Sequence, residues 1–185
     1  MDSALRDIWG EGALVAPCEQ KPRGEADFEL IELMFFAYRD FIGDADHLLE
    51  NFGLGRAHHR VLHFVTRRPG LAIAELLDIL KITKQSLNRV LKVLLDEDYV
   101  AAVPGESDRR QRRLFPSPRG EALARDVARL QSKRFARIFA VLPDGARDDA
   151  RALLLAMIDP SERRKVEALV GPADPRGARG RERAT

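Results

Sequence analysis

Apolar residues recur at helical spacing near the middle of the chain. Five aliphatic positions follow the i, i+3, i+4, i+7, i+8 pattern, which places them on one stripe of an α-helix. They are Leu87, Val90, Leu91, Leu94 and Leu95. Such a stripe must face a core, so the pattern predicts a helix over residues 83–97 with one buried face.

The opposite face of this helix carries side chains that form hydrogen bonds. They are Lys84, Gln85, Ser86, Asn88, Arg89 and Lys92, and Thr83 is the expected N-cap. The donors and acceptors of Gln, Asn, Ser and Arg match base edges in the major groove of DNA, which is wide enough for an α-helix. A solvated surface face is the alternative, because every surface helix exposes polar residues.

A short hairpin is predicted directly after this helix. Residues 99–103 have β-type character, Pro104 and Gly105 punctuate them, and Leu114 with Phe115 suggests a return strand. Four arginines lie between the strands: Arg109, Arg110, Arg112 and Arg113. Clustered guanidinium groups repel one another and bind phosphate by forked hydrogen bonds, so residues 104–113 are predicted to grip a phosphate backbone, with Asp108 holding one arginine.

The preceding segments complete a helix-turn-helix. Residues 56–66 and 73–80 read as helices, and Lys81 with Ile82 turns the chain into the helix over 83–97. Helix, short helix, turn, helix and two-stranded wing is the order of a winged helix-turn-helix.

Long helices flank this unit on both sides. A helix capped by Asp27 and ending at Gly53 is apolar nearly all round in its first half, which favours a subunit interface over the alternative of a core helix in a monomer. After the wing, Ser117 and Pro118 are predicted to start a long helix that runs to Pro143. Two shorter helices should follow, one through residues 153–158 and one that Ser161 caps and that runs to Val170. Both should pair with the first long helix of the same and the partner chain.

Charge and composition limit the partners. Residues 1–51 contain four basic and twelve acidic residues, a net charge of −8. The remaining residues carry +10, so that the whole chain has a net charge of +2. A polyanion is therefore expected to meet the later part of the chain. Cys18 is the only cysteine, so no intramolecular disulfide can form, and no signal or transmembrane run is present, which predicts a cytoplasmic protein without a membrane partner.

Candidate chemistry outside the helix-turn-helix is sparse. His59 and His63 are spaced i, i+4 and could share a helix face, with His47 as a third metal ligand, but ordinary surface or packed imidazoles are the favoured interpretation. No nucleophile–base pair, phosphate loop or strong metal spacing is found. We expect no enzymatic activity, no cofactor and no metal.

Three stretches resemble the MarR (multiple antibiotic resistance regulator) family of bacterial winged-helix transcription factors. They are HHRVLHFV, RPGLAIAELLDILKITKQSLNRVLKVLLDEDYV and DRRQRRLFPSPRG. Asp108, Arg110 and Gly120 stand at the family spacing of its Asp-x-Arg wing and following helix. Asp98 stands where the family usually has Gly, and Pro116 with Ser117 replaces its Leu-Thr pair.

The resemblance implies an obligate homodimer that places two recognition helices in successive major grooves of double-stranded DNA and two wings in flanking minor grooves. Contacts are implied for Gln85, Ser86, Asn88 and Arg89 from the helix and for Arg110, oriented by Asp108, from the wing. We expect a repressor that binds a pseudo-palindromic operator; the alternative is a winged-helix module for protein contacts. A small aromatic acid is a further implied partner, and its weak candidate residues are Tyr38, Arg39, His47, His59 and His63.

The expected fold is mainly α with a small β-wing: a winged helix-turn-helix DNA-binding lobe plus an N- and C-terminal helical dimerisation platform. The predicted parts are a flexible arm (1–26), a dimerisation helix (27–53), the DNA-binding lobe (54–117), C-terminal dimerisation helices (118–170) and a disordered basic tail (171–185).

Overall fold

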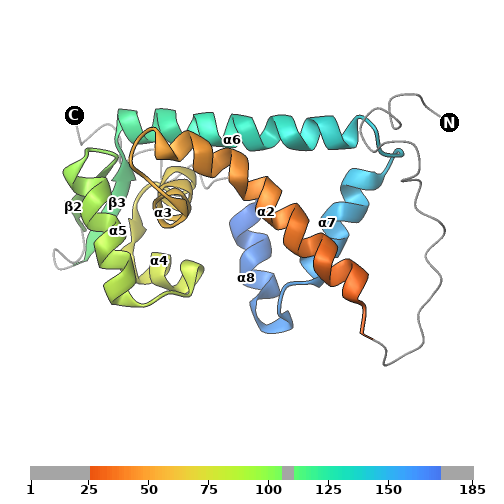
Figure 1. Cartoon of the computed structure of the whole chain (residues 1–185). Coiled ribbons are helices and arrows are strands. Elements are labelled where there is room, and N and C mark those ends of the chain that lie inside the picture. Colours follow the sequence, from red (N-terminus) through yellow and green to blue (C-terminus); the bar gives the residue numbers. More distant parts are fainter. Residues whose placement is uncertain (1–25, 106–110, 172–185) are drawn as a thin grey trace.

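The computed structural model describes residues 26–105 and 111–171, and within them the chain is mainly helical with one small sheet (Figure 1). The helices are α2 (Phe28–Glu50), α3 (Arg56–Arg67), α4 (Ile73–Leu80), α5 (Lys84–Asp96), α6 (Pro118–Phe139), α7 (Ala146–Ala156) and α8 (Pro160–Val170). The strands are β1 (Leu71–Ala72), β2 (Val100–Pro104) and β3 (Arg112–Pro116). The predicted fold class, a winged helix-turn-helix with flanking helices, is confirmed.

The sheet is antiparallel, with strand order β1-β3-β2. Leu71 pairs with Leu114 across β1 and β3, and the Gly70 amide donates to the Leu114 carbonyl over 2.8 Å. Strand β1 was not predicted, because two residues are too few to show the alternation that marks a strand. It matters here because it attaches the wing to the start of α4.

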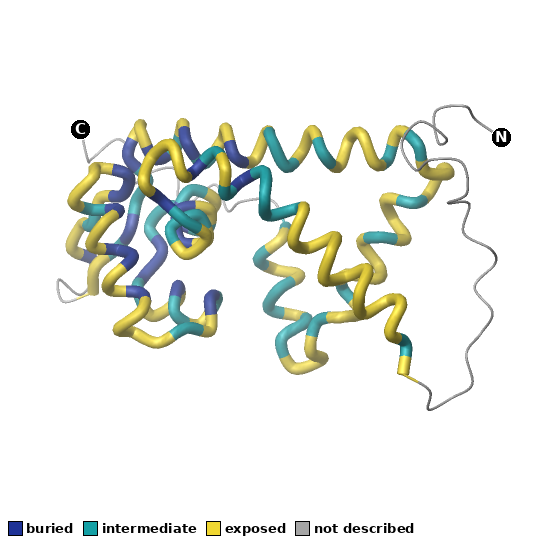
Figure 2. Tube along the Cα trace, in the orientation of Figure 1, coloured by how far each residue is buried: buried dark blue, intermediate teal, exposed yellow. Residues whose placement is uncertain are grey.

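One hydrophobic core fills the lobe formed by α3, α4, α5, the sheet and the first turns of α6 (Figure 2). The predicted stripe of α5 is buried at Leu87, Val90, Leu91 and Leu94, as expected. Leu95 is only half-buried. Full burial of an aliphatic side chain contributes roughly 1.5–3 kcal/mol, so this stripe fixes which face of α5 points outward.

Helix α2 divides into two halves with different surroundings. Ala45 and Leu49 in its second half are buried in the core of the lobe. Its first half is exposed, with 67% of Phe28 and 68% of Phe35 accessible to solvent. The alternative of a core helix within one chain is therefore wrong for this half. The helix ends at Glu50, before the predicted end at Gly53, whose φ of +66° suits the turn that follows.

Three of the four predicted N-caps are confirmed. Asp27, Thr83 and Ser117 each accept a hydrogen bond from a backbone amide of the following turn, at 3.2, 3.2 and 3.0 Å. The prediction that Ser161 caps the last helix is wrong. Asp159 is the cap of α8 and accepts from the Ser161 amide over 2.8 Å, with Pro160 in the first helical position.

Several predictions fall on residues outside the described ranges. They concern the N-terminal arm with Cys18, the wing tip with Asp108, Arg109 and Arg110, and the basic tail, and they stay predictions. Among the residues that the structure describes, no helix combines the length and apolar character needed to cross a membrane.

Candidate nucleic-acid interface

Helix α5 is held at both ends and along one face. The Thr83 hydroxyl accepts from the Ser86 amide over 3.2 Å, which satisfies one of the amides that the first turn leaves free, and it donates to the Ser86 hydroxyl over 3.0 Å. At the other end, the Tyr99 amide donates to the Leu94 carbonyl over 2.8 Å and leads into β2. The helix therefore presents its outward face from a rigid support.

The outward face of α5 is exposed at every predicted contact position. Thr83, Lys84, Gln85, Ser86, Asn88, Arg89 and Lys92 all have exposed side chains. Lys92 forms a 3.5 Å ion pair with Asp96. Within the described part of the chain, no hydrogen bond or ion pair is recorded for the side chains of Gln85, Asn88 and Arg89. Their donors and acceptors face solvent and are available to a ligand.

The wing is a hairpin of β2 and β3 in which Val103 pairs with Arg113 and Pro104 with Arg112. Arg112 and Arg113 therefore lie in β3 and not at the hairpin tip, where they were expected. Arg112 is exposed. Arg113 donates through Nη1 to the Gly70 carbonyl (3.3 Å) and to the Glu75 carboxylate (3.2 Å), so the structure gives it protein partners.

Glu75 joins the wing to the start of α4 through two hydrogen bonds to its carboxylate. Its carboxylate also accepts from the Ala72 amide over 2.7 Å, at the start of α4. Arg113 and Glu75 thus brace the wing against the first helix of the helix-turn-helix. Glu75 was not among the predicted site residues, although its place three residues after Ala72, the residue before the predicted helix, is a capping signal.

The junction between α5, β2 and α6 is unusually close. Asp98 turns the chain with φ of +54°, a left-handed conformation that Asp tolerates better than most residues. It stands where the family usually has a glycine. The Ser117 amide donates to the Tyr99 carbonyl over 3.1 Å, and a Cβ at Gly120 would overlap that carbonyl oxygen. Arg119 donates to the Glu97 carbonyl over 2.6 Å and lies 4.2 Å from the centre of the Tyr99 ring. The start of α6 is therefore fixed to the end of α5.

Comparison with known proteins agrees with this geometry. The sequence model of the MarR family matches residues 52–111, which contain α3, α4, α5 and β2. The HTH-type transcriptional regulator PetP of Rhodobacter capsulatus is 40% identical over 160 residues, covering 86% of this chain and 93% of PetP. The chain belongs to the MarR family. It is thus a winged-helix transcriptional regulator, and the similarity to PetP extends over nearly the whole length of that relative.

Solved MarR structures share the fold. A MarR regulator from Methanosarcina mazei Go1 is 27% identical with a TM-score of 0.60, and the match covers 70% of this chain and 94% of that one. FabT of Streptococcus pneumoniae, determined in complex with DNA, is 16% identical with a TM-score of 0.64 over 71% of this chain and 94% of FabT. The MarR fold therefore extends beyond the stretch that the family model matches.

The five candidate effector residues are not gathered at one site. His59 and His63 lie edge to face with ring centroids 6.2 Å apart, and burial lowers the pKa of both imidazoles. His47 is on α2, 3.6 Å from Glu50, and Arg39 donates to Asp40 over 2.8 Å. Tyr38 is exposed. Only the two α3 histidines are in recorded contact with each other.

The described residues contain no cluster suited to a metal ion, and the groove on α6 does not involve the five candidates. In residues 26–105 and 111–171, no group of three or more His, Cys, Asp or Glu side chains could hold a metal ion. An open groove of about 550 Å³ runs along α6 and contains none of the five candidates. Its lining residues are Arg125, Ala128, Arg129, Ser132, Lys133 and Ala136.

Proposed function

We propose that this MarR-family regulator is a homodimeric repressor that binds a pseudo-palindromic operator. Helix α5 enters the major groove, and the wing approaches the flanking minor groove. The observation that carries the proposal is the outward face of α5, where Gln85, Asn88 and Arg89 are exposed and unpaired among the described residues. Asn and Arg can form paired hydrogen bonds with adenine and guanine respectively. The DNA-bound structure of FabT supports this use of the shared fold.

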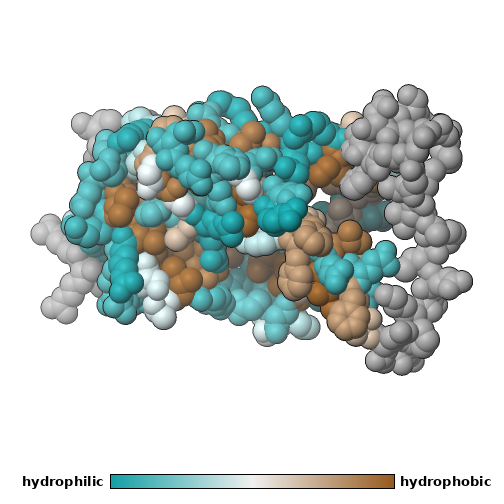
Figure 3. Space-filling view, viewed as in Figure 1, coloured by the Kyte–Doolittle hydropathy of each residue, from teal (hydrophilic) through white to brown (hydrophobic). Residues whose placement is uncertain are grey.

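Dimerisation is supported by the exposed apolar surface of the flanking helices. Phe28, Phe35 and Phe36 on α2, Leu153 on α7 and Met157 at its C-cap are each more than half exposed. Figure 3 shows hydrophobic side chains gathered over the first half of α2. Large apolar patches on one chain mark interaction surfaces, and a second copy would cover this one with the same residues about a twofold axis.

A twofold dimer has a consequence for the DNA site. The two copies of α5 must reach half-sites about 10 bp apart, or a multiple of that spacing, on one face of the duplex. The operator should therefore be an inverted repeat, and a monomeric variant should lose most of its affinity for it. Covering a promoter with such a dimer favours repression.

The test is binding of the full chain to its own promoter fragment in a mobility-shift and anisotropy titration. We expect a shifted band at the size of one dimer per operator. Affinity should fall by roughly 10³-fold or more between about 50 and 200 mM salt if six or more phosphates are contacted. Equal binding to the promoter and to random DNA, or a flat salt titration, would favour the protein-interaction module instead.

The proposal extends to control by a small aromatic acid. The half-buried imidazole of His59 on α3, with the ring of His63 edge to face against it, supports the extension. A thermal-shift screen of phenolic acids and divalent metals tests the extension with His59→Ala as control. An effector should raise the melting temperature of the wild type more than that of the variant, and a screen without any hit would remove the extension.

A further inference from the structure

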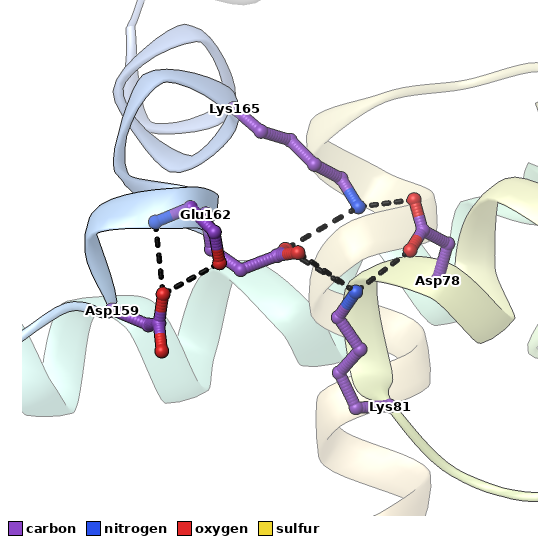
Figure 4. A network of polar contacts seen from close by, with 6 residues as sticks. Asp78, Lys81, Asp159, Glu162 and Lys165 are labelled. Carbon is purple, nitrogen blue, oxygen red and sulfur yellow. Dashed lines mark hydrogen bonds and ion pairs between the residues drawn. The ribbon is translucent and has the colours of Figure 1, made fainter.

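Helix α8 is joined to the helix-turn-helix of its own chain by polar contacts. Lys81, in the turn between α4 and α5, lies 2.8 Å from Asp78 and 3.2 Å from Glu162 of α8. Lys165 of α8 forms an ion pair with Asp78 and lies 3.7 Å from Glu162. Figure 4 shows these four side chains meeting between the two elements, with positive and negative charges alternating. We call Asp78, Lys81, Glu162 and Lys165 the α4–α8 network.

A second set of contacts lies at the other end of α8. Arg68, at the end of α3, donates to the carbonyls of Ala168 (2.6 Å) and Leu169 (2.8 Å), and Arg67 donates to the Gly171 carbonyl (3.2 Å). The last carbonyls of a helix have no partners within it, and a guanidinium both satisfies them and complements the negative end of the helix dipole. Both ends of α8 are thus fastened to the lobe.

The same helix is also tied to α7. Arg163 donates to the carbonyls of Leu155 (3.1 Å) and Ala156 (3.2 Å) at the end of that helix. Since no residue of α8 is buried, hydrophobic packing does not dominate its attachment. Helix α8 is therefore a polar bridge between α7 and the lobe, and none of its own residues belongs to the core.

The position of Lys81 connects this bridge to the recognition helix. Lys81 takes φ of +51°, closes α4 by donating its amide to the Leu77 carbonyl, and stands two residues before Thr83, the cap of α5. A shift of Lys81 therefore moves the start of α5. In a dimer, binding depends on the distance between two recognition helices, so small shifts of each lobe reduce the fit to both half-sites at once.

We propose that the α4–α8 network positions the recognition helix for DNA, with Glu162 and Lys165 acting as positioning residues that do not themselves touch the operator. This inference rests on the proposed DNA-binding function. Separate ion pairs on a surface contribute little to stability, but a network that links two bodies restricts their relative orientation. Its loss should therefore change DNA affinity more than it changes folding.

The test exchanges the two α8 charges through the double substitution Glu162→Lys with Lys165→Glu. This variant keeps the net charge and places like charges opposite Asp78 and Lys81. We expect operator binding to weaken roughly 2- to 30-fold, the range by which changes within a coupling network alter affinity. The dimer measured by sedimentation should be unchanged, and amide hydrogen exchange in α8 of the DNA-free protein should become faster.

The chain offers a matched control on the same helix. Arg164 and Glu167 have the same spacing and charge types, are exposed, and have no recorded ion pair in the described residues. Arg164→Glu with Glu167→Lys should bind and exchange as the wild type does. Adding Asp78→Lys with Lys81→Glu to the first double variant restores opposite charges across the network and should recover slow exchange and part of the affinity.

The probe is a duplex selected from random DNA by the wild-type protein. Wild-type operator affinity in the Glu162/Lys165 double variant would overturn the inference, whether or not α8 exchanges faster. The same holds if the Arg164/Glu167 control loses as much affinity. A wild-type protein that selects no sequence would instead refute the proposed function, and hydrogen exchange would then still decide whether the network holds α8.

Discussion

Substitution of Gly120 by alanine should push α6 away from the DNA-binding lobe. Gly120 lies in the first turn of α6, where an added Cβ would overlap the Tyr99 carbonyl oxygen and come within 3.2 Å of Leu62. The first neighbour is backbone and cannot rotate away. Overpacking of this kind costs about 1–3 kcal/mol. For a chain of this size, that corresponds to a fall in melting temperature of roughly 2–12 °C.

Gly43→Ala provides the control for this substitution. Gly43 is also helical, but nothing lies within 4 Å of its added Cβ, so only the gain in helix propensity of up to about 1 kcal/mol remains. Thermal and urea unfolding of both variants should therefore change in opposite directions. If Gly120→Ala were as stable as Gly43→Ala, the close junction between α6 and Tyr99 would be refuted. Operator affinity should also fall in Gly120→Ala, because its α6 must move away from α5.

Three further predictions concern the cap, the charges and the wing. Thr83→Ala removes the hydroxyl that caps α5 and should lower the free energy of unfolding by about 1 kcal/mol in a urea titration; an unchanged midpoint would contradict the cap. Hydrogen bonds from Lys165 and then Lys81 lower the pKa of Asp78 from 3.8 to about 2, so its stabilising contribution is complete above pH 3.8 and is lost as the pH falls toward 2. The difference in unfolding midpoint between wild type and Asp78→Asn should accordingly shrink over that window, and a constant difference would argue against the ion pairs. Arg113→Ala should weaken DNA binding without changing the slope of log Kd against log salt, because Arg113 contacts protein, whereas Arg112→Ala should reduce that slope by about one; equal slopes for both variants would contradict the assignment.

The sequence predicted those features that depend on local periodicity and capping. The stripe of α5, the order of helices and wing, and the caps at Asp27, Thr83 and Ser117 all follow from residues close together in the chain. Asp98, which departs from the glycine usual in the family, takes the left-handed turn itself with φ of +54°. These parts form because hydrogen bonds and amphipathic faces are set within one or two helical turns.

Features that depend on distant partners were not predicted. Arg113 was placed on the wing tip because nothing nearby in the sequence identifies Glu75, 38 residues earlier, as its partner. Likewise, no local pattern pairs Asp78 with Lys165, 87 residues later. The apolar first half of α2 was interpreted as an interface from its pattern, and within the described residues it remains exposed. Long-range pairing of charged residues leaves almost no periodic signal.

Base reading by α5 is tested most directly by the selection of bound sequences from random DNA. The wild type, Asn88→Ala and Arg112→Ala should each be carried through the same selection. A bidentate contact discriminates against a wrong base by about 1–3 kcal/mol. We predict that the wild type selects an inverted repeat, that Asn88→Ala loses the preference at one position in each half-site, and that Arg112→Ala keeps the sequence while binding it more weakly. Identical preferences for the wild type and Asn88→Ala, or no preference in either, would contradict base reading by this helix.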